Sequence, residues 1–505
     1  MTVVGTIARR EFYDNLLTFR FLFGTLILVI LVSAITLVNV KNFIDIRKEY
    51  QFSLQETERN LKETRLYCQL RYTALKPPEI LSVLNLGVTQ KLGNSVDITL
   101  REVPSVAKKF TEENLLLSIF PSLDLTLVYK IVISLLALLF GFDAVCGEKE
   151  KGTLKIILSQ NVSRFNVILG KYLGRLLTLT TILVISLIIG FLILLTQFAS
   201  LGLLDWLRLA LFGLFTLLYI SIFLVLGFLI STLTKKGSSS LLFSLIVWVA
   251  LVIILPNLTT YLGTVMKPAP PEKTVDAQIE EISRQTDKAI GAWEEAHPQN
   301  IVLGGMMGLD EWAIENADQS TIDYFKRLIS FSEPLLRKKA NDIWNVKQDY
   351  YRALMKQEKL ASFLARWLTT GLYEEATELV LKTDLANYEK FIQQAILYRE
   401  SIFQYLQSKD AYHSLRYFTV MEEKDILPFE EYMKKMWSRK KPGGGYYTIS
   451  DHPPLQLYDF PRFSYQQEGL PDFLPRAIIF LVIFIMLNLL LFVASAVAFN
   501  FYDAR

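Results

Sequence analysis

Cysteine and histidine are scarce in this chain. Its 505 residues include two cysteines and three histidines. A disulfide framework needs several cysteines, and a zinc site usually needs a cluster of cysteine and histidine ligands. The sequence therefore predicts neither a disulfide-stapled fold nor a metal site.

A strong net charge and the common catalytic motifs are also absent. The formal charge is +3 at pH 7, which is too close to neutral to predict nucleic-acid binding. The nearest approach to a phosphate-binding loop, Gly170-Lys171, is followed by Tyr172, so the chain is not expected to bind ATP in that way. No serine-hydrolase elbow or HExxH zinc motif occurs. An enzymatic function has no positive support, and no cofactor is expected in this chain.

Long apolar runs are abundant. The sequence is 51% hydrophobic and 20% charged, with a mean hydropathy of +0.31. Six runs of about 18 residues or more carry few charges, and each can cross a hydrocarbon core of about 30 Å. The sequence therefore predicts an α-helical polytopic membrane protein with six transmembrane helices. These runs are residues 21–40, 125–142, 167–197, 207–231, 240–262 and 475–499.

Lysine and arginine in the short connections predict the orientation of the spans. They occur before the first span, between the second and third, between the fourth and fifth, and after the last. Residues 198–207 have none. We therefore expect a multi-pass protein of the cytoplasmic (inner) cell membrane, with both termini (1–20 and 500–505) in the cytoplasm. Cys68 is then expected outside and Cys146 inside.

Two polar stretches, residues 41–124 and 263–474, are expected to fold on the extracytoplasmic side. In the first, a helix over 42–64 and alternating strands at 66–72 and 96–100 predict a small mixed α/β subdomain.

The second stretch is expected to form a large, mainly helical domain. A helix capped by Ser332, with Pro334 in its first turn, is expected to pack antiparallel against a later helix through matching apolar stripes. An irregular segment then returns the chain to the last span. The expected parts are helix 276–296, turn 304–308, helix 332–368, helix 385–407 and return segment 441–475.

Few polar groups lie inside the predicted spans. Lys130 is near the outer end of the second span, from where its amine can reach the surface. Gln197 and Asn488 are expected to form helix-to-helix hydrogen bonds, although such groups can also mark a substrate path.

A short charged hairpin, residues 143–166, is closely bracketed by the second and third spans. Alternating charges at 148–151 lead into Gly152 and an apolar run from Leu154, and Ser163 can cap the next helix. This hairpin cannot perform chemistry alone, but its shape suits it to be held by a partner.

The first 20 residues predict an amphipathic helix lying along the membrane surface. Apolar positions that include Phe12 and Leu16 alternate with Arg9 and Arg10. The alternative is that these residues are simply the first turns of the first span.

The hairpin resembles the cytoplasmic signature of ABC-2-type permeases, the membrane subunits of one class of ATP-driven transporters. In that pattern an acidic residue and Gly-Thr-Leu precede a helix, and Val-Ser-Arg and Gly-Lys open the next span. Asn161 stands where the family usually has proline, which predicts a looser turn. The matching residues are Glu148, Gly152, Thr153, Leu154, Val162, Ser163, Arg164, Gly170 and Lys171.

The second polar stretch resembles a subgroup of that family with a long insertion of unassigned function before the last span. The similar motifs are Thr383-Asp384-Leu385, Tyr398-Arg399, Pro461-Arg462-Phe463 and Tyr502-Asp503-Ala504-Arg505.

The resemblance implies a transport subunit, expected to be an exporter, driven by a separate ATP-binding subunit that holds ATP and Mg²⁺. Two permeases, identical or related, would sit in membrane lipid above two such subunits. Residues 1–20 would be a connecting helix beside the contact, through Arg9, Arg10, Phe12 and Leu16. The residues implied in ATPase coupling are Glu148, Lys149, Glu150, Gly152, Thr153, Leu154, Ser163, Arg164 and Lys171.

Two other functions remain open. In one, the ATPase moves the outer domain to act on envelope or lipoprotein partners without transport. In the other, the protein is a membrane-anchored enzyme, which a deep outer pocket with clustered carboxylates would support.

Overall fold

The computed structural model describes residues 2–87, 92–104, 123–159, 162–196, 201–299, 317–436 and 452–501. Within these residues, six helices are long and apolar enough to cross a membrane, which confirms the predicted polytopic helical fold. The spans are α2 (Phe19–Glu63); α5 (Leu125–Val128) to α7 (Cys146–Glu150) through η3 (Tyr129–Ile133) and α6 (Ser134–Gly141); α9 (Arg164–Leu195); α10 (Leu203–Leu233); α11 (Gly237–Val249) to α12 (Leu255–Met266) through η4 (Ala250–Ile254); and α18 (Leu470–Asn500).

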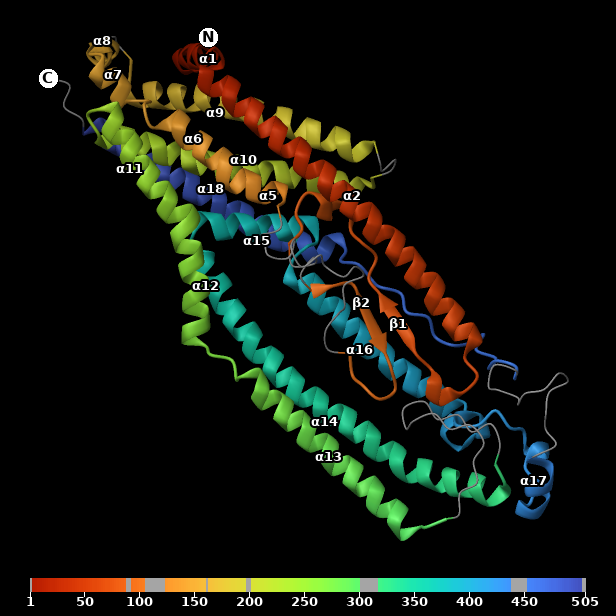
Figure 1. Cartoon of the computed structure of the whole chain (residues 1–505). Coiled ribbons are helices and arrows are strands. Elements are labelled where there is room, and N and C mark those ends of the chain that lie inside the picture. The colour runs from red at the N-terminus through yellow and green to blue at the C-terminus, as the bar shows by residue number, and fades with distance from the viewer. Residues whose placement is uncertain are drawn as a thin grey trace.

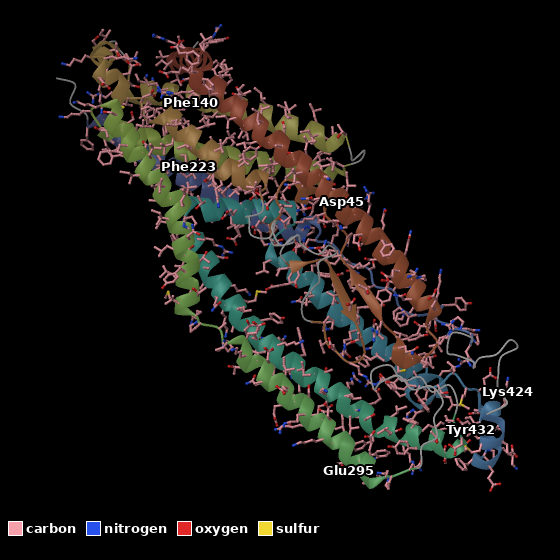
Figure 2. All side chains as sticks on the ribbon, viewed as in Figure 1. Asp45, Phe140, Phe223, Glu295, Lys424 and Tyr432 are labelled. Carbon is pink, nitrogen blue, oxygen red and sulfur yellow. The ribbon has the colours of Figure 1, made fainter. Side chains whose placement is uncertain are left out.

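The molecule is elongated, with the span bundle at one end and a folded domain at the other (Figure 1). Phe140 and Phe223 lie among the spans, whereas Glu295, Lys424 and Tyr432 lie at the far end of the domain (Figure 2). The helix α2 has 45 residues, about twice the number needed to cross a hydrocarbon core. It therefore extends from the span bundle into the domain.

A separate helix, α1 (Val3–Leu16), precedes the first span. The side chain of Thr18 caps α2 by accepting a hydrogen bond from the amide of Phe21, and this cap separates the two helices. The helix α1 packs closely on α9, where a Cβ atom at Gly174 would lie 2.5 Å from the carbonyl oxygen of Ala8. These residues are therefore not the first turns of the span. Their location on the cytoplasmic surface stays a prediction.

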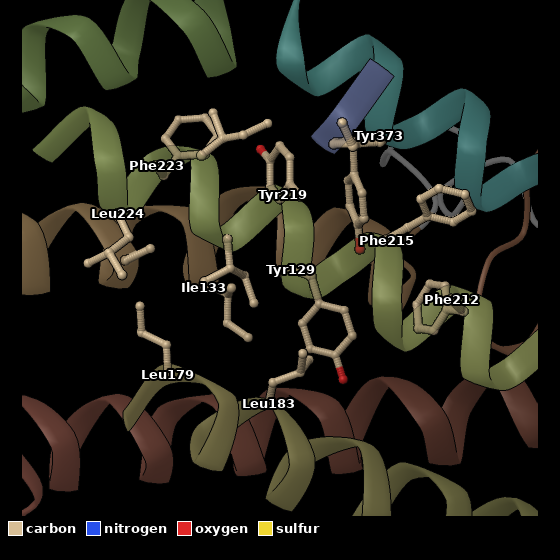
Figure 3. Packing of buried hydrophobic residues seen from close by; sticks show 14 of the residues in the cluster. Tyr129, Ile133, Leu179, Leu183, Phe212, Phe215, Tyr219, Phe223, Leu224 and Tyr373 are labelled. Carbon is tan, nitrogen blue, oxygen red and sulfur yellow. The ribbon is translucent and has the colours of Figure 1, made fainter. Parts of the chain in front are cut away.

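The core of the bundle surrounds α10, which packs against α6, α9 and α18. Tyr129, Phe212, Phe215, Tyr219 and Phe223 are fully buried there (Figure 3). Close packing of α6 on α10 also depends on glycine, since a Cβ at Gly141 would lie 2.6 Å from the carbonyl oxygen of Leu224.

The small subdomain between the first two spans contains an antiparallel pair, β1 (Tyr72–Leu75) and β2 (Ser95–Ile98), in which Tyr72 pairs with Ile98. The strand predicted at 66–72 is wrong, because residues 67–69 form a 3₁₀ turn, η1 (Tyr67–Gln69). The alternation that suggested a strand comes from Leu66 and Leu70, which flank this turn and are both buried.

The large domain beyond the spans begins with two long helices, α13 (Glu272–Ala296) and α14 (Gln319–Ala365). The predicted start of the second helix at Ser332 is wrong: Asp318 caps α14, and Pro334 lies inside its 47 residues. Proline costs one backbone hydrogen bond in such a position but does not end a helix that packing holds. The predicted turn at 304–308 lies outside the described residues.

The predicted pairing of α14 with the later helix, α16 (Leu385–Ser408), is also wrong. The helix α14 packs mainly on α12 and α13, whereas the apolar face of α16 covers the strands and part of the return segment. An apolar stripe shows which face of a helix is buried, but not which neighbour buries it.

A helix that the sequence did not predict, α15 (Thr369–Leu381), connects α14 to α16. Ten of its thirteen residues are buried, and it packs on α10 and α18 within the same apolar core as the spans. The large domain therefore enters the span bundle through α15 (Figure 1).

Two of the motifs noted in the insertion, Tyr398-Arg399 and Pro461-Arg462-Phe463, hold the large domain together. The hydroxyl of Tyr398 donates to the carbonyl of Pro461 at 2.8 Å, and Arg399 reaches the carbonyl of Leu100 at 3.3 Å. Arg462 pairs with Glu58 of α2 at 2.9 Å. These contacts join α16, the strand region, the return segment and α2. The motif at 502–505 lies outside the described residues.

Candidate functional site

The charged hairpin forms two short helices, α7 and α8 (Thr153–Ser159), followed by α9 (Figure 1). Gly152 joins α7 to α8 with φ of +74°, in the left-handed region that favours glycine. Open space surrounds this position, so the backbone conformation and not crowding explains the glycine. Ser163 caps α9 by accepting a hydrogen bond from the amide of Asn166 at 3.2 Å.

Lys171 joins the hairpin to α1. Its amine lies 2.7 Å from a carboxylate oxygen of Glu11 and 3.2 Å from one of Glu148, and its side chain is buried. Glu148 also accepts a hydrogen bond from the hydroxyl of Thr153. A single amine therefore connects α1, α7 and α9.

Arg175, one helical turn further along α9, extends this network towards the first two spans. It contacts Glu11 at 3.2 Å and Asp143 at 2.7 Å, and Asp143 is also paired with Arg20 at 2.7 Å. Burial alone would raise the pKa of Glu11, but the charges of Arg175 and Lys171 outweigh burial and lower it. Glu11 is therefore ionised at neutral pH.

The opposite side of α7 is fixed to the turn between α10 and α11. Lys149 donates to the carbonyl of Thr234 at 3.0 Å, and Glu150 accepts from the amide of Gly237, at the start of α11, at 3.0 Å. The hydroxyl of Ser231 accepts from the amides of Val145 and Cys146 at 3.0 and 2.9 Å. The hairpin is therefore held on two sides.

Most residues named from the sequence come together here, but several face the protein and not solvent. Leu154 is buried in the bundle core, and Arg164 donates to the carbonyl of Asn500 at the end of α18. In α1, Arg9 and Arg10 are exposed, whereas Phe12 and Leu16 are half-buried. The role of all these residues in coupling stays a prediction.

The sequence reasoning missed Glu11, Arg20, Asp143 and Arg175, which complete the network. A signal was available, because Lys171 and Arg175 lie one turn apart at the start of an apolar span. Charges in such segments are expensive unless they pair. Two basic residues at that spacing predict acidic partners on neighbouring helices.

The solvent-facing surface of the hairpin is basic and apolar. Lys151, Lys155 and Ile156 are exposed, Ile156 to 65%. Phe165, just beyond, is half exposed. In the part of the chain that the structure describes, neither lysine forms a salt bridge. This surface can receive an acidic partner with an apolar recess.

At the other end of the bundle, α15 makes a second cluster of polar contacts. Tyr373 stacks on Tyr219 at 4.3 Å and shares a hydrogen bond with Thr216 at 3.0 Å. Lys130 pairs with Glu374 of α15, so its amine does not extend to the surface as predicted. The buried Arg208 donates to the carbonyl of Val380 at 2.7 Å.

Two polar groups near or within the spans have structural partners. Asn488 accepts a hydrogen bond from Ser221 and donates to the carbonyl of Leu218, which is helix-to-helix bonding. Asp124 caps α5; burial raises its pKa to about 6, although backbone hydrogen bonds from Leu127 and Leu86 oppose the rise. Gln197 lies outside the described residues.

A polar groove of about 440 Å³ lies between α2 and the strands. Glu49, Glu56 and Asp97 are among its lining residues. Glu56 and Asp97 are exposed, and no metal-binding cluster of acids, histidines or cysteines occurs among the residues with described positions. These carboxylates do not form a deep catalytic pocket of the kind that would support an enzyme.

Comparison with known proteins identifies related sequences. A family described as "ABC-2 family transporter protein" matches residues 5–415. A "Probable ABC transporter permease protein NosY" of Stutzerimonas stutzeri is 33% identical over 129 residues, covering 24% of this chain and 44% of that protein. A protein of the same name from Pseudomonas aeruginosa is 40% identical over 68 residues, covering 14% of this chain and 23% of that protein. The chain thus matches less than half the length of these curated relatives.

Proposed function

Because this chain belongs to the ABC-2 family of transporter proteins, we propose that it is the permease subunit of an exporter driven by a separate ATP-binding subunit. The observation that supports this most directly is the two-sided attachment of the hairpin. Lys171 and Glu148 attach it to α1 and α9, while Lys149 and Glu150 attach it to the α10–α11 turn. A force applied to α8 would therefore reach several spans together.

The ATP-binding subunit would carry ATP and Mg²⁺ and bind the exposed face of α8. Lys151 and Lys155 would meet acidic groups, and Ile156 would enter an apolar recess. The internal acids Glu148 and Glu150 would act by positioning the hairpin. A second permease would complete the assembly, and α1 would lie beside the contact with Arg9 and Arg10 near lipid headgroups.

Coupled ATP hydrolysis tests this proposal. The full chain is reconstituted with a candidate ATP-binding subunit, and stimulated ATPase activity is measured. Lys155→Glu with Ile156→Asp should reduce stimulation about tenfold or more, because it reverses a charge and removes an apolar anchor. The matched control is Lys62→Glu with Leu54→Asp, on exposed positions of the outer half of α2. Equal stimulation in both variants would contradict the proposed contact.

A second function, movement of the outer domain without transport, is favoured by α15. This helix lies in the core of the spans and connects α14 to α16, and two hydrogen bonds from Arg366 to Glu375 brace the short link at its start. The helix α2 offers a second continuous connection of about 68 Å at 1.5 Å per residue. Motion of the spans would therefore move the domain.

Vesicles containing the assembled complex separate the two functions. Solute accumulation that requires ATP supports transport. ATP turnover without movement of any candidate solute, together with a nucleotide-dependent distance change between spin labels on α13 and α10, supports the second function.

A further inference from the structure

The end of α14 carries basic and aromatic side chains on one exposed face. Phe363 is 54% exposed, and Trp367, just beyond the helix, is 80% exposed; their rings meet edge to face with centroids 6.4 Å apart. Lys356 and Lys359 are also exposed. Intervals of three and four residues put these side chains on the same side of a helix. We call Lys356, Lys359, Phe363 and Trp367 the basic-aromatic face.

Contacts with the fifth span on either side of the two aromatic residues fix their depth. The hydroxyl of Thr370, three residues after Trp367, donates to the carbonyl of Leu251 at 3.3 Å. Ala361 lies before them and packs on Gly263 of α12, where an added Cβ atom would lie 2.9 Å from the Cβ of Ala361. The end of α14 therefore lies beside the stretch of the fifth span between Leu251 and Gly263.

That stretch contains the edge of the hydrocarbon core on the side of the large domain. Two lysines immediately precede Gly237, the first residue of the fifth span, and no charged residue follows before Lys267, so Gly237 marks the opposite edge. At 1.5 Å per residue, Leu251 and Gly263 lie about 21 Å and about 39 Å along the helix from Gly237. The core is about 30 Å thick, so its edge falls between these two residues.

The residue types of the basic-aromatic face fit this depth. Tryptophan concentrates at membrane–water interfaces, because its ring is apolar and its N–H needs a polar partner. Tyr261, two residues before Gly263, is also exposed at this level. Lys359 and Lys356 lie about one and two helical turns further from the core, towards the lipid headgroups. Neither lysine forms a salt bridge with any carboxylate whose position is described.

From this arrangement we propose that the basic-aromatic face binds anionic phospholipid in the leaflet on the side of the large domain. Trp367 and Phe363 would lie at the edge of the hydrocarbon core, and Lys356 and Lys359 would pair with the phosphate and the anionic headgroup. From this level α14 runs away from the bundle, so the lipid would hold the base of the large domain at the membrane surface (Figure 1). The proposal does not depend on what the protein exports or on whether it transports.

Fluorescence quenching tests the depth of Trp367. The full chain is placed in nanodiscs of phosphatidylcholine that carries bromine either just below the headgroup or near the ends of the acyl chains. The contribution of Trp367 is the difference between the unmodified chain and Trp367→Phe, and bromine just below the headgroup should quench it most. Trp344→Phe is the matched control, because Trp344 lies about 35 Å further along α14 and its contribution should not be quenched.

Brominated phosphatidylglycerol tests the selectivity for anionic lipid. At the same low mole fraction it should quench Trp367 about twofold more than brominated phosphatidylcholine does, because the two lysines enrich it locally. Lys356→Gln with Lys359→Gln should remove this excess and leave quenching by phosphatidylcholine unchanged. Lys288→Gln with Lys338→Gln removes the same charge from exposed positions further from the spans and should keep the excess.

Four results would overturn the proposal. Trp367 that no brominated lipid quenches would face water or protein. Strongest quenching by bromine at the chain ends would put Trp367 inside the core instead of at its edge. Equal quenching by the two headgroups in the unmodified chain would show that the lysines select no lipid. Efficient disulfide crosslinking between two copies carrying Trp367→Cys would make the face an interface between subunits.

Discussion

The two ends of the span bundle are attached to the rest of the chain by different chemistry. At the hairpin end, buried ion pairs among Glu11, Lys171 and Arg175 connect helices that otherwise meet at small residues. At the domain end, α15 buries ten of its thirteen residues and stacks Tyr373 on Tyr219. Lys130 and Glu374 form its ion pair with the spans, and neither makes another salt bridge among the described residues. Removing one partner of a buried ion pair lowers the stability strongly, because the other charge stays buried without a partner. Apolar packing tolerates replacement of one apolar side chain by another of similar volume.

Loss of Arg175 should have the largest effect. Arg175→Leu would leave the carboxylates of Glu11 and Asp143 short of a buried partner, which costs about 3–5 kcal/mol. Thermal unfolding in detergent measures the loss of stability. Adding Glu11→Gln to Arg175→Leu should restore part of it, since one unpaired charge is removed. A second substitution that worsened stability further would mean that the network does not act through charge.

Loss of the tyrosine stack should have a smaller effect at the other end. Tyr373→Leu keeps an apolar side chain but removes the stacking on Tyr219 and the hydrogen bond to Thr216, with an expected cost of about 2 kcal/mol. The same unfolding measurement applies. A matched variant, Tyr350→Leu, changes a half-buried tyrosine of α14 away from the bundle and should cost less. Equal losses of stability in the two variants would show that the contacts of Tyr373 do not attach α15 to the bundle more strongly than an ordinary half-buried tyrosine would.

The two ends should also respond to pH in opposite directions. The pKa of Glu11 is lowered on folding, so its contribution is present above its unfolded pKa of 4.5 and is lost as the pH falls through the folded value. The pKa of Asp124 is raised from 3.8 to about 6, so its contribution is present below 3.8 and is lost as the pH rises through about 6.

Unfolding temperatures from well below pH 4.5 up to pH 7 test this difference, because the folded pKa of Glu11 lies below 4.5. Asp124→Asn should remove part of the destabilisation that accompanies the rise through about 6. Glu11→Gln should instead weaken the loss of stability in acid. If both substitutions shifted the same limb of the pH profile, the contrast between the two ends would be wrong.

The spans and the hairpin were predictable because their signals are local. Apolar length defines a span, and Gly152 and Ser163 mark the turn and the helix start within a few residues. The helix α15 could not be recognised in this way. Glu374, Glu375 and Glu378 interrupt its apolar stripe, and only the tertiary structure shows that Lys130 neutralises one of these acids.

The sequence also could not show whether the charged side chains of the hairpin face solvent or the rest of the protein. A run of alternating charges is typical of a solvated face, yet Glu148 and Lys149 bind groups on α9 and at the end of α10. These partners are 23 and 83 residues away along the chain. Local pattern indicates that a charged residue needs a partner, but long-range packing decides whether that partner is inside the protein.

The smallest effect is expected for a residue whose role is local. Ser163→Ala removes the cap of α9 and should cost about 1 kcal/mol, because one amide at the start of the helix loses its acceptor. Ser163→Asp restores an acceptor and should recover the loss, since a negative charge at a helix start is also favourable. Unfolding temperature measures both. A much larger loss for Ser163→Ala would mean that this serine, like Lys171, belongs to the network that fixes the hairpin and is not an isolated cap.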